Sequence, residues 1–153
     1  NITVKQNNRK LKVNFKDTGV PHAIVYVDQI DKMDVHTIGS AIRYHKRFFP
    51  RGANANFVEQ IAKDYIKVRT YERGVEGETL ACGTGAVASA IIAFLKFADK
   101  TKNKGTFRMQ VLTLSTDVLN IYFDYNENKI SNVWLEGKAK VIYKGEYNIH
   151  PLP

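Results

Sequence analysis

The only cysteine of the chain, Cys82, stands directly before a Gly83-Thr84-Gly85 turn, and an almost wholly apolar run at 86–97 follows. This pattern predicts a helix that begins just after the cysteine. The first amides of a helix lack intrahelical partners and carry partial positive charge, so they favour a thiolate and bind carboxylates. Cys82 is therefore a candidate acid–base group with a lowered pKa. Glycines at 83 and 85 would let a ligand approach the backbone closely.

Two other interpretations of this stretch remain open at this point. A lone cysteine is commonly a small buried hydrophobic residue with no chemical role. The run 83–88 also has the G-x-G-x-x-A form of a dinucleotide site, but that motif expects its first glycine immediately after a strand. A loop of charged and small residues separates Arg73 from Gly83, and no acidic residue ends a second strand about 20 residues later. We do not expect a nucleotide-binding fold.

Composition restricts the class of protein. The chain has 153 residues, 44% of them hydrophobic and 25% charged, which is typical of a single globular domain. The formal net charge is +8, but the basic residues are dispersed and no nucleic-acid motif accompanies them. We expect solvated lysines and no nucleic-acid partner. A non-catalytic module whose basic surface binds an anionic partner is the alternative from another function class.

The sequence has no features of a membrane, secreted or metal-binding protein. No apolar run reaches the roughly 18 residues of a membrane span, and no signal-peptide pattern opens the chain. One cysteine cannot form an internal disulfide, so the sequence predicts a cytoplasmic protein without a membrane partner. His36 and His45 have no second ligand at metal spacing, and we expect no metal. The chain begins at Asn1 inside a strand-like pattern, from which we expect a piece of a longer protein.

Periodicity predicts the elements that must position Cys82. Alternating patterns predict a hairpin from strands at 2–5 and 11–15, a second hairpin at 54–61 and 65–71, and a buried strand at 23–27. Asp34 is a candidate cap of a short amphipathic helix. Strands are predicted at 106–114, 117–124, 129–135 and 139–147, with Trp134 in the core.

The helix after Cys82 has apolar residues around nearly its whole circumference. Such a helix must be buried on all sides. We therefore expect an α+β fold in which a strongly curved, mixed or antiparallel sheet forms a barrel around this central helix. Cys82 would then lie at the open end of the barrel.

Five motifs occur in one order along the chain: Gly-Val-Pro-His-Ala at 19–23, Asn-Ala-Asn-Phe-Val at 54–58, Tyr-Glu-Arg-Gly at 71–74, Glu-Thr-Leu-Ala-Cys-Gly-Thr-Gly-Ala at 78–86, and Val-Trp-Leu-Glu-Gly at 133–137. With these motifs the chain resembles the C-terminal half of the diaminopimelate epimerases, over nearly its whole length. The chain departs from the pattern in two places: Val20 stands where many members have asparagine, and the loop at 74–78 is one residue longer than the shorter family form.

The resemblance implies an isomerase of lysine and peptidoglycan-precursor biosynthesis. Such an enzyme interconverts LL- and meso-diaminopimelate without pyridoxal phosphate or another cofactor. Two lobes each supply one cysteine, so residues 1–153 would be the C-terminal lobe, and the N-terminal lobe would lie outside this chain. The isolated chain would then be inactive, with the missing lobe and a second copy in a homodimer as its partners. The close alternative is another racemase of the same fold that acts without pyridoxal phosphate on proline, hydroxyproline or a related acid.

The resemblance also assigns residues near the reacting carbon. Cys82 corresponds to the acid–base residue of the C-terminal lobe. Gly83 and Thr84 would offer backbone amides to the reacting carboxylate. Glu72 corresponds to the catalytic residue beside this cysteine and the substrate's amino group. His22 corresponds to the histidine associated with the cysteine of the other lobe.

Two further residues correspond to groups that bind the distal end of the substrate. Arg73 matches the residue that clamps the distal carboxylate, a task that suits a bidentate guanidinium. Asn54 matches the side chain that reads the distal, non-reacting stereocentre.

Overall fold

The computed structural model describes residues 2–6, 9–97 and 104–147. These form a nine-stranded sheet, two α-helices and two short 3-10 helices. The strands are β1 Ile2–Gln6, β2 Arg9–Asp17, β3 Pro21–Tyr26, β4 Asn54–Ala62, β5 Tyr65–Glu72, β6 Gly77–Thr79, β7 Lys104–Leu112, β8 Val118–Asn126 and β9 Lys129–Glu136. The helices are α1 Val35–Arg43 and α2 Gly83–Phe97, with 3-10 turns at Ile30–Lys32 and Lys46–Phe48.

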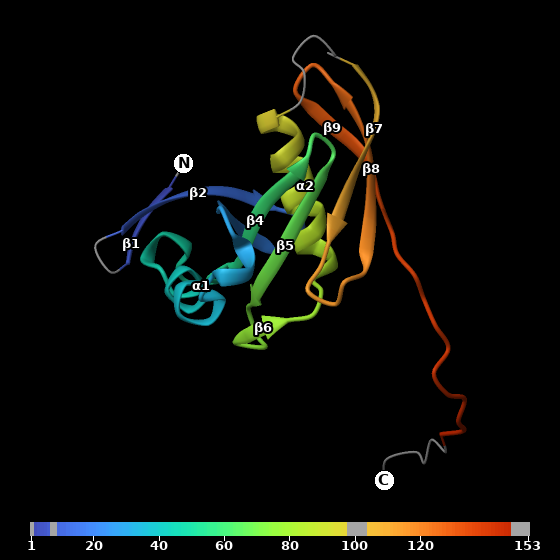
Figure 1. Ribbon diagram of the computed structural model, residues 1–153, viewed down its shortest axis with the longest axis horizontal. Helices are drawn as coiled ribbons and strands as arrows, with labels where there is room; N and C mark the ends of the chain where they lie inside the picture. Colours follow the sequence, from blue (N-terminus) through green and yellow to red (C-terminus); the bar gives the residue numbers. More distant parts are fainter. Residues whose placement is uncertain (1, 7–8, 98–103, 148–153) are drawn as a thin grey trace.

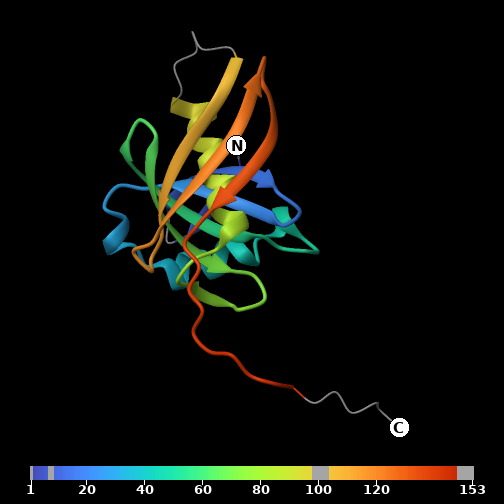
Figure 2. The same cartoon turned by 90° about the vertical axis from the view of Figure 1, so that its right-hand side faces the viewer.

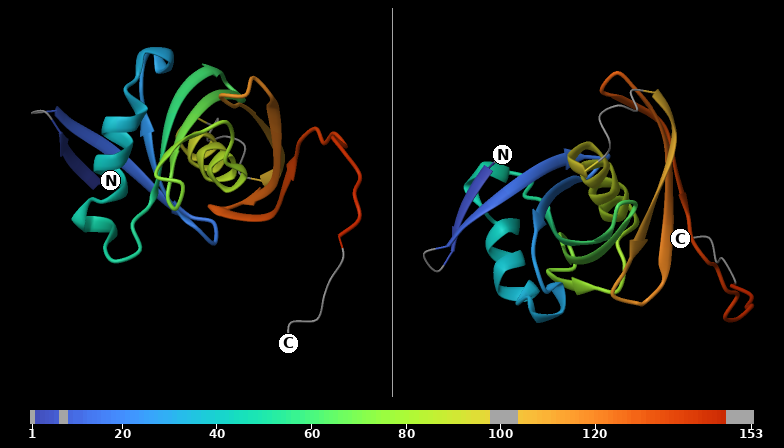
Figure 3. Two further views of the ribbon diagram at one scale, coloured as in Figure 1. Left: turned by 90° about the horizontal axis from the view of Figure 1, so that it is seen from below. Right: turned by 45° about the horizontal axis from the view of Figure 1, so that its top comes forward.

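The sheet is mixed and strongly curved (Figure 1). Its strand order is β1-β2-β3-β4-β5-β7-β8-β9, and β6 pairs with β5 off this path. The pairs β3–β4 and β5–β7 are parallel, and all other pairs are antiparallel. Seen from below in Figure 3, the sheet curls around α2, and α1 lies on its outer side. The expected α+β architecture, a curved mixed sheet wrapped around an apolar helix, is confirmed.

The middle strands bury both faces because their side chains alternate between the two helices. Ile24, Val58 and Val68 belong to the cluster around α2. Val25 and Phe57 belong to the cluster around α1. Strands that are apolar on both faces are what a sheet covered on two sides requires, and the strand predicted at 23–27 is therefore confirmed as β3.

The two hairpins and the capped helix are also as predicted. β1 pairs with β2, and β4 with β5, in antiparallel register. Asp34 caps α1, its Oδ1 accepting a hydrogen bond from the backbone amide of Thr37 at 3.0 Å. The Asn-Lys-Gly sequence at 103–105 is typical of a turn, but Asn103 lies outside the described part of the chain, and β7 starts at Lys104.

The prediction that α2 is buried on all sides is correct only in part. Its alanines Ala86, Ala88, Ala90 and Ala93 are buried, but Leu95 is 44% exposed. The sheet explains this difference because it is a half-barrel, with β1 and β9 at the two ends of the strand order. One side of the helix is therefore not covered by strands.

Two predictions near the C-terminal end are wrong. The segment 139–147 is not a strand, and Figures 1 and 2 show it running away from the body of the molecule. A strand needs a neighbouring edge for its hydrogen bonds, and none of the described strands pairs with this segment. Trp134 is 71% exposed rather than in the core, because it lies on the end strand β9.

The loop expected between Arg73 and Cys82 contains one further element. The short strand β6 pairs with the end of β5, with Glu72 opposite Gly77. An ion pair holds this hairpin, since Arg69 Nε donates to Glu78 Oε1 at 2.6 Å. The pairing fixes where the chain leaves β5 and reaches Cys82. No helix in the described part of the chain is long and apolar enough to cross a membrane.

Candidate active site

The site lies where the α2 face of the sheet becomes polar. His22, Asn56 and Thr70 share that face with the apolar residues around α2 because each lies an even number of positions from one of them on its strand. All three side chains are buried. They lie beneath the first turn of α2, and the site is built around that turn.

Cys82 occupies the N-cap position of α2. Its carbonyl accepts the first helical hydrogen bond, from the amide of Ala86 at 2.8 Å. The half-buried Sγ lies 3.6 Å from the hydroxyl of Thr84. The thiol therefore faces the amides and the hydroxyl of the first helical turn.

The pKa of Cys82 is raised above its ordinary value. Burial is the main cause, and the negative charge of Glu72 acts in the same direction. The Thr84 hydroxyl and the amides of Gly85 and Thr84 oppose this effect, as expected at a helix N-terminus, but they do not outweigh it. The predicted lowering of the pKa is thus wrong for this structure, because desolvation of the thiolate exceeds the stabilisation by the helix.

Glu72 is the last residue of β5 and its charge acts on Cys82, and Arg73 follows it directly. Glu72 Oε2 accepts a hydrogen bond from the hydroxyl of Thr79 at 2.9 Å, which ties it to β6. The guanidinium of Arg73 donates to the carbonyl of Arg51 at 3.1 Å. Within the described residues no carboxylate forms an ion pair with Arg73. Its charge is thus available to an acidic ligand.

Asn54 is 2% exposed and both ends of its amide are engaged. Oδ1 accepts from the backbone amide of Arg73 at 2.7 Å, and Nδ2 donates to the carbonyl of Pro21 at 3.5 Å. This side chain therefore joins the starts of β3 and β4 to the end of β5. Its observed role is to fix the backbone of Arg73.

His22 is fully buried, and both ring nitrogens have partners. Nε2 lies 3.1 Å from the Thr84 hydroxyl, and Nδ1 lies 3.0 Å from Asn56 Nδ2. Burial lowers the pKa of His22 to about 4, with Arg73 acting in the same direction and Asp17 opposing it. The imidazole is neutral near neutral pH.

Asn56 and Thr70 were missed by reasoning from sequence. Thr70 donates to Asn56 Oδ1 at 2.9 Å, and the two residues are directly opposite each other in the β4–β5 register. The signal was present, since two asparagines two positions apart on a buried strand must point to the same face. Two polar residues on a buried face need partners there.

The two glycines of the turn have different roles. Gly83 is exposed, and an added Cβ would make an ordinary contact with Leu135. Gly85 is buried, and an added Cβ would collide with Asn56 Oδ1. The sequence prediction that both glycines admit a ligand therefore fails for Gly85, whose missing side chain makes room for the asparagine.

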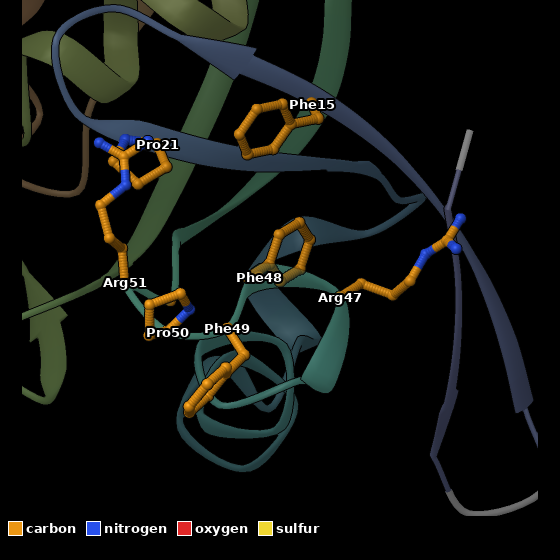
Figure 4. Close-up of a pocket in the computed structure, with 8 residues that line it drawn as sticks. Phe15, Pro21, Arg47, Phe48, Phe49, Pro50 and Arg51 are labelled. Carbon is orange, nitrogen blue, oxygen red and sulfur yellow. The ribbon is translucent and has the colours of Figure 1, made fainter.

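A hollow of about 590 Å³ borders the start of α2, with β2 on one side and β9 on the other. Its lining includes Gly83 and Thr84 together with the apolar Val87, Ile91 and Leu135. A second hollow, of about 250 Å³, lies beside Phe15 and Phe48 and is shown in Figure 4. None of the predicted site residues lines this second hollow, but two of its lining residues contact them: the carbonyl of Arg51 accepts from Arg73, and that of Pro21 accepts from Asn54.

The structure thus brings the predicted residues together at one end of α2. Asn54 contacts Arg73, His22 contacts Thr84, Thr84 contacts Cys82, and the charge of Glu72 acts on Cys82. Within the described residues no group of three metal-ligating side chains forms a metal site. The chemical groups present are a thiol, a carboxylate, a guanidinium and helix amides, which suit proton transfer on an anionic substrate.

Comparison with known proteins identifies one family of enzymes. Residues 14–140 match the family model described as diaminopimelate epimerase. The diaminopimelate epimerase of Aquifex aeolicus is 48% identical over 131 residues, which is 86% of this chain and 44% of that protein. Those of Chlorobaculum tepidum and a Hydrogenobaculum species are 43% and 40% identical, over 86% and 95% of this chain and 48% and 50% of those proteins.

The chain spans about half the length of the relatives it matches. The match covers β3 to β9, and with them the turn that carries Cys82 and every predicted site residue. The chain belongs to the diaminopimelate epimerase family.

Proposed function

We propose that this chain is the C-terminal lobe of a cofactor-independent epimerase that interconverts LL- and meso-diaminopimelate. A second lobe, outside this chain, would supply the other cysteine. The observation that carries the proposal is the thiol of Cys82 at the N-cap of α2, within reach of the helix amides and of the charge of Glu72. A thiol at this position would be an acid–base group beside amides that can bind a carboxylate.

The chemistry requires two groups on opposite faces of the α-carbon. A thiolate on one face removes the α-proton, and the electron pair left on carbon is delocalised toward the α-carboxylate. A thiol on the other face delivers its own proton to that carbon, which inverts the configuration and leaves a thiolate behind. Amides of Gly83 and Thr84 would stabilise the charge that develops on the carboxylate. One turnover therefore exchanges the roles of the two cysteines.

The electrostatics of this lobe favour the thiol form of Cys82. Burial and the charge of Glu72 both raise its pKa. Cys82 is therefore suited to deliver the proton first, with the cysteine of the other lobe as the base. In the reverse direction Cys82 must lose its proton, and the amides and hydroxyl of the first helical turn would then stabilise its thiolate.

The distal end of the substrate would bind at Arg73. Its guanidinium has no carboxylate partner in the described structure, and Asn54 fixes its backbone. A free guanidinium is suited to a second carboxylate, which favours a dicarboxylic amino acid over proline or hydroxyproline. Val20 offers no polar group where many family members have asparagine, so Arg73 would carry a larger share of distal recognition.

The test begins with the coding region upstream of Asn1. We expect it to encode a lobe of about 100 residues or more with a second cysteine before a glycine-opened helix. The complete gene product should convert LL-diaminopimelate to the meso form and introduce solvent deuterium at the α-carbon. The isolated chain should do neither. Turnover of proline but not of diaminopimelate would contradict the proposed substrate. Turnover by the isolated chain would contradict the two-lobe mechanism.

A further inference from the structure

A chain of hydrogen bonds leads from the middle of the sheet to the thiol. The Thr70 hydroxyl donates to Asn56 Oδ1 at 2.9 Å, and Asn56 Nδ2 lies 3.0 Å from His22 Nδ1. His22 Nε2 lies 3.1 Å from Thr84 Oγ1, which in turn lies 3.6 Å from Cys82 Sγ. We propose that Thr70 and Asn56 are positioning residues for Cys82: they set the tautomer of His22, and His22 directs the hydroxyl proton of Thr84 toward the thiol.

The direction of the hydrogen bonds follows from the asparagine. Thr70 donates to the amide oxygen, so the amide nitrogen of Asn56 faces His22 and donates to Nδ1. A neutral imidazole has one donor and one acceptor nitrogen. Nδ1 is therefore the acceptor, and Nε2 carries the proton.

The tautomer then determines what Thr84 can do. The Thr84 oxygen accepts a hydrogen bond from His22 Nε2, so the hydroxyl proton of Thr84 is free to point at Cys82 Sγ. With the opposite tautomer, the hydroxyl would donate to the histidine, and Sγ would lose this donor. A hydroxyl that donates to sulfur stabilises the thiolate relative to the thiol.

Burial makes the arrangement specific. His22 and Asn56 have no exposed surface, and Thr70 is 4% exposed. Buried polar groups must satisfy one another, since water cannot replace a missing partner. Burial lowers the pKa of His22 to about 4, so the ring is neutral near neutral pH. The buried part of the hydrogen-bond chain is thus a connected set of neutral groups. It leads to the exposed first turn of α2.

The helix turn is also shaped to admit this unit. Gly85 leaves space that Asn56 Oδ1 occupies, at a position where a Cβ would collide with it. A Cβ at this position would also lie only 3.3 Å from Cys82 Sγ. One glycine therefore lets the asparagine and the thiol approach the helix start together.

The inference rests on the proposed function for its catalytic meaning, but its structural part can be tested without turnover. The first measurement is the tautomer of His22 by NMR of isotope-labelled histidine in the unmodified chain. The chain has four histidines, and His22→Gln identifies the signal by its loss. We expect a neutral ring protonated at Nε2. A ring protonated at Nδ1 would overturn the proposal.

The second measurement is the pH profile of Cys82 alkylation in two matched variants. Thr70→Val removes the hydroxyl and keeps the shape, whereas Thr70→Ser keeps the hydroxyl. We expect Thr70→Val to shift the profile to higher pH and slow alkylation about 3- to 10-fold below the midpoint, as loss of one hydrogen bond predicts. Thr70→Ser should retain the parent profile. If Thr70→Val had the same pH profile as the parent protein, the positioning role would be overturned. The same conclusion would follow if Thr70→Val and Thr70→Ser slowed alkylation equally.

Activity of the complete gene product separates this inference from the proposed function. If the unmodified protein epimerises, Thr70→Val should lower kcat by a similar factor with little change in KM. An active enzyme with an unaffected Thr70→Val variant would overturn the inference alone. An inactive enzyme whose His22 tautomer and alkylation profiles are as expected would overturn the proposed function alone.

Discussion

The two helices pack on opposite faces of the same strands, yet their N-termini differ. α1 begins with Asp34, whose carboxylate accepts a hydrogen bond from Thr37 in the first turn. α2 begins with Cys82, whose thiol leaves the first turn exposed at Gly83 and Thr84. A capped N-terminus stabilises a helix, whereas an open one can bind an anion. The same structural position therefore holds a stabilising cap on one face of the sheet and, as we propose, an acid–base group on the other.

The polar groups beneath the helices differ in the same way. Beneath α1 the cluster is almost wholly apolar, with Val25, Phe57 and Ile42 buried in it. Beneath the start of α2 lie the buried polar residues His22, Asn56 and Thr70. Buried polar groups cost stability unless every partner is present, so their concentration under one helix end supports the site proposed there.

The largest expected contrast is in catalysis. In the complete gene product, Cys82→Ala should lower epimerisation by about 10²- to 10⁴-fold or more, because the proton acceptor or donor on one face is lost. Asp34→Ala, at the equivalent position of α1, should leave kcat unchanged and lower only the melting temperature. Rates with both substrate stereoisomers and thermal unfolding measure the two effects. If Asp34→Ala lost as much activity as Cys82→Ala, the proposed difference between a structural and a catalytic helix N-terminus would be contradicted.

The second contrast is in the pH dependence of stability. Burial lowers the pKa of His22 to about 4 from an ordinary value of 6.5, so the unfolded chain binds a proton that the folded chain excludes. This contribution is fully present above pH 6.5 and is lost as the pH falls toward 4, for a total of about 3 kcal/mol. Urea unfolding between these pH values measures it. His22→Gln should flatten the dependence, and an unchanged slope would show that another group causes it.

The third contrast separates the two glycines at the start of α2. Gly85→Ala should destabilise the chain by roughly 1–3 kcal/mol, because the new methyl group collides with the Asn56 amide. Gly83→Ala should be tolerated, because its Cβ meets only Leu135 at 3.4 Å and alanine favours the helix. Denaturant midpoints of the two variants measure the difference. Equal effects would mean that Asn56 moves aside easily.

The smallest contrast concerns the cap of α1. Hydrogen bonds from Thr37 lower the pKa of Asp34 below its ordinary value of 3.8. The stability that this carboxylate provides is present above that value and is lost as the pH falls through the lowered pKa. Asp34→Asn keeps a capping oxygen and removes the charge, so it should lose this acid dependence while changing the melting temperature at neutral pH only slightly. A parent-like acid dependence in Asp34→Asn would assign the effect to another carboxylate.

Much of the fold was predictable because each signal is local. The alternation in β4 and β5, the continuous apolar run of β3, and Asp34 before an amphipathic helix are each visible in fewer than ten neighbouring residues. Trp134 and the segment 139–147 were mispredicted because an apolar strand pattern does not say whether a covering partner exists. That partner must come from elsewhere in space.

The amino-acid sequence by itself determined the curved sheet around an apolar helix, the position of Cys82 before that helix, and membership of the epimerase family. These depend on residue types and their order. Only the tertiary structure decided the raised pKa of the thiol, the role of Gly85, and the line of hydrogen bonds from Thr70 to Cys82. Desolvation and hydrogen bonding depend on which distant residues meet, and the β4–β5 register joins Thr70 to Asn56 while α2 lies across both strands. The physical reason is that burial is a property of the assembled molecule, not of any segment of its chain.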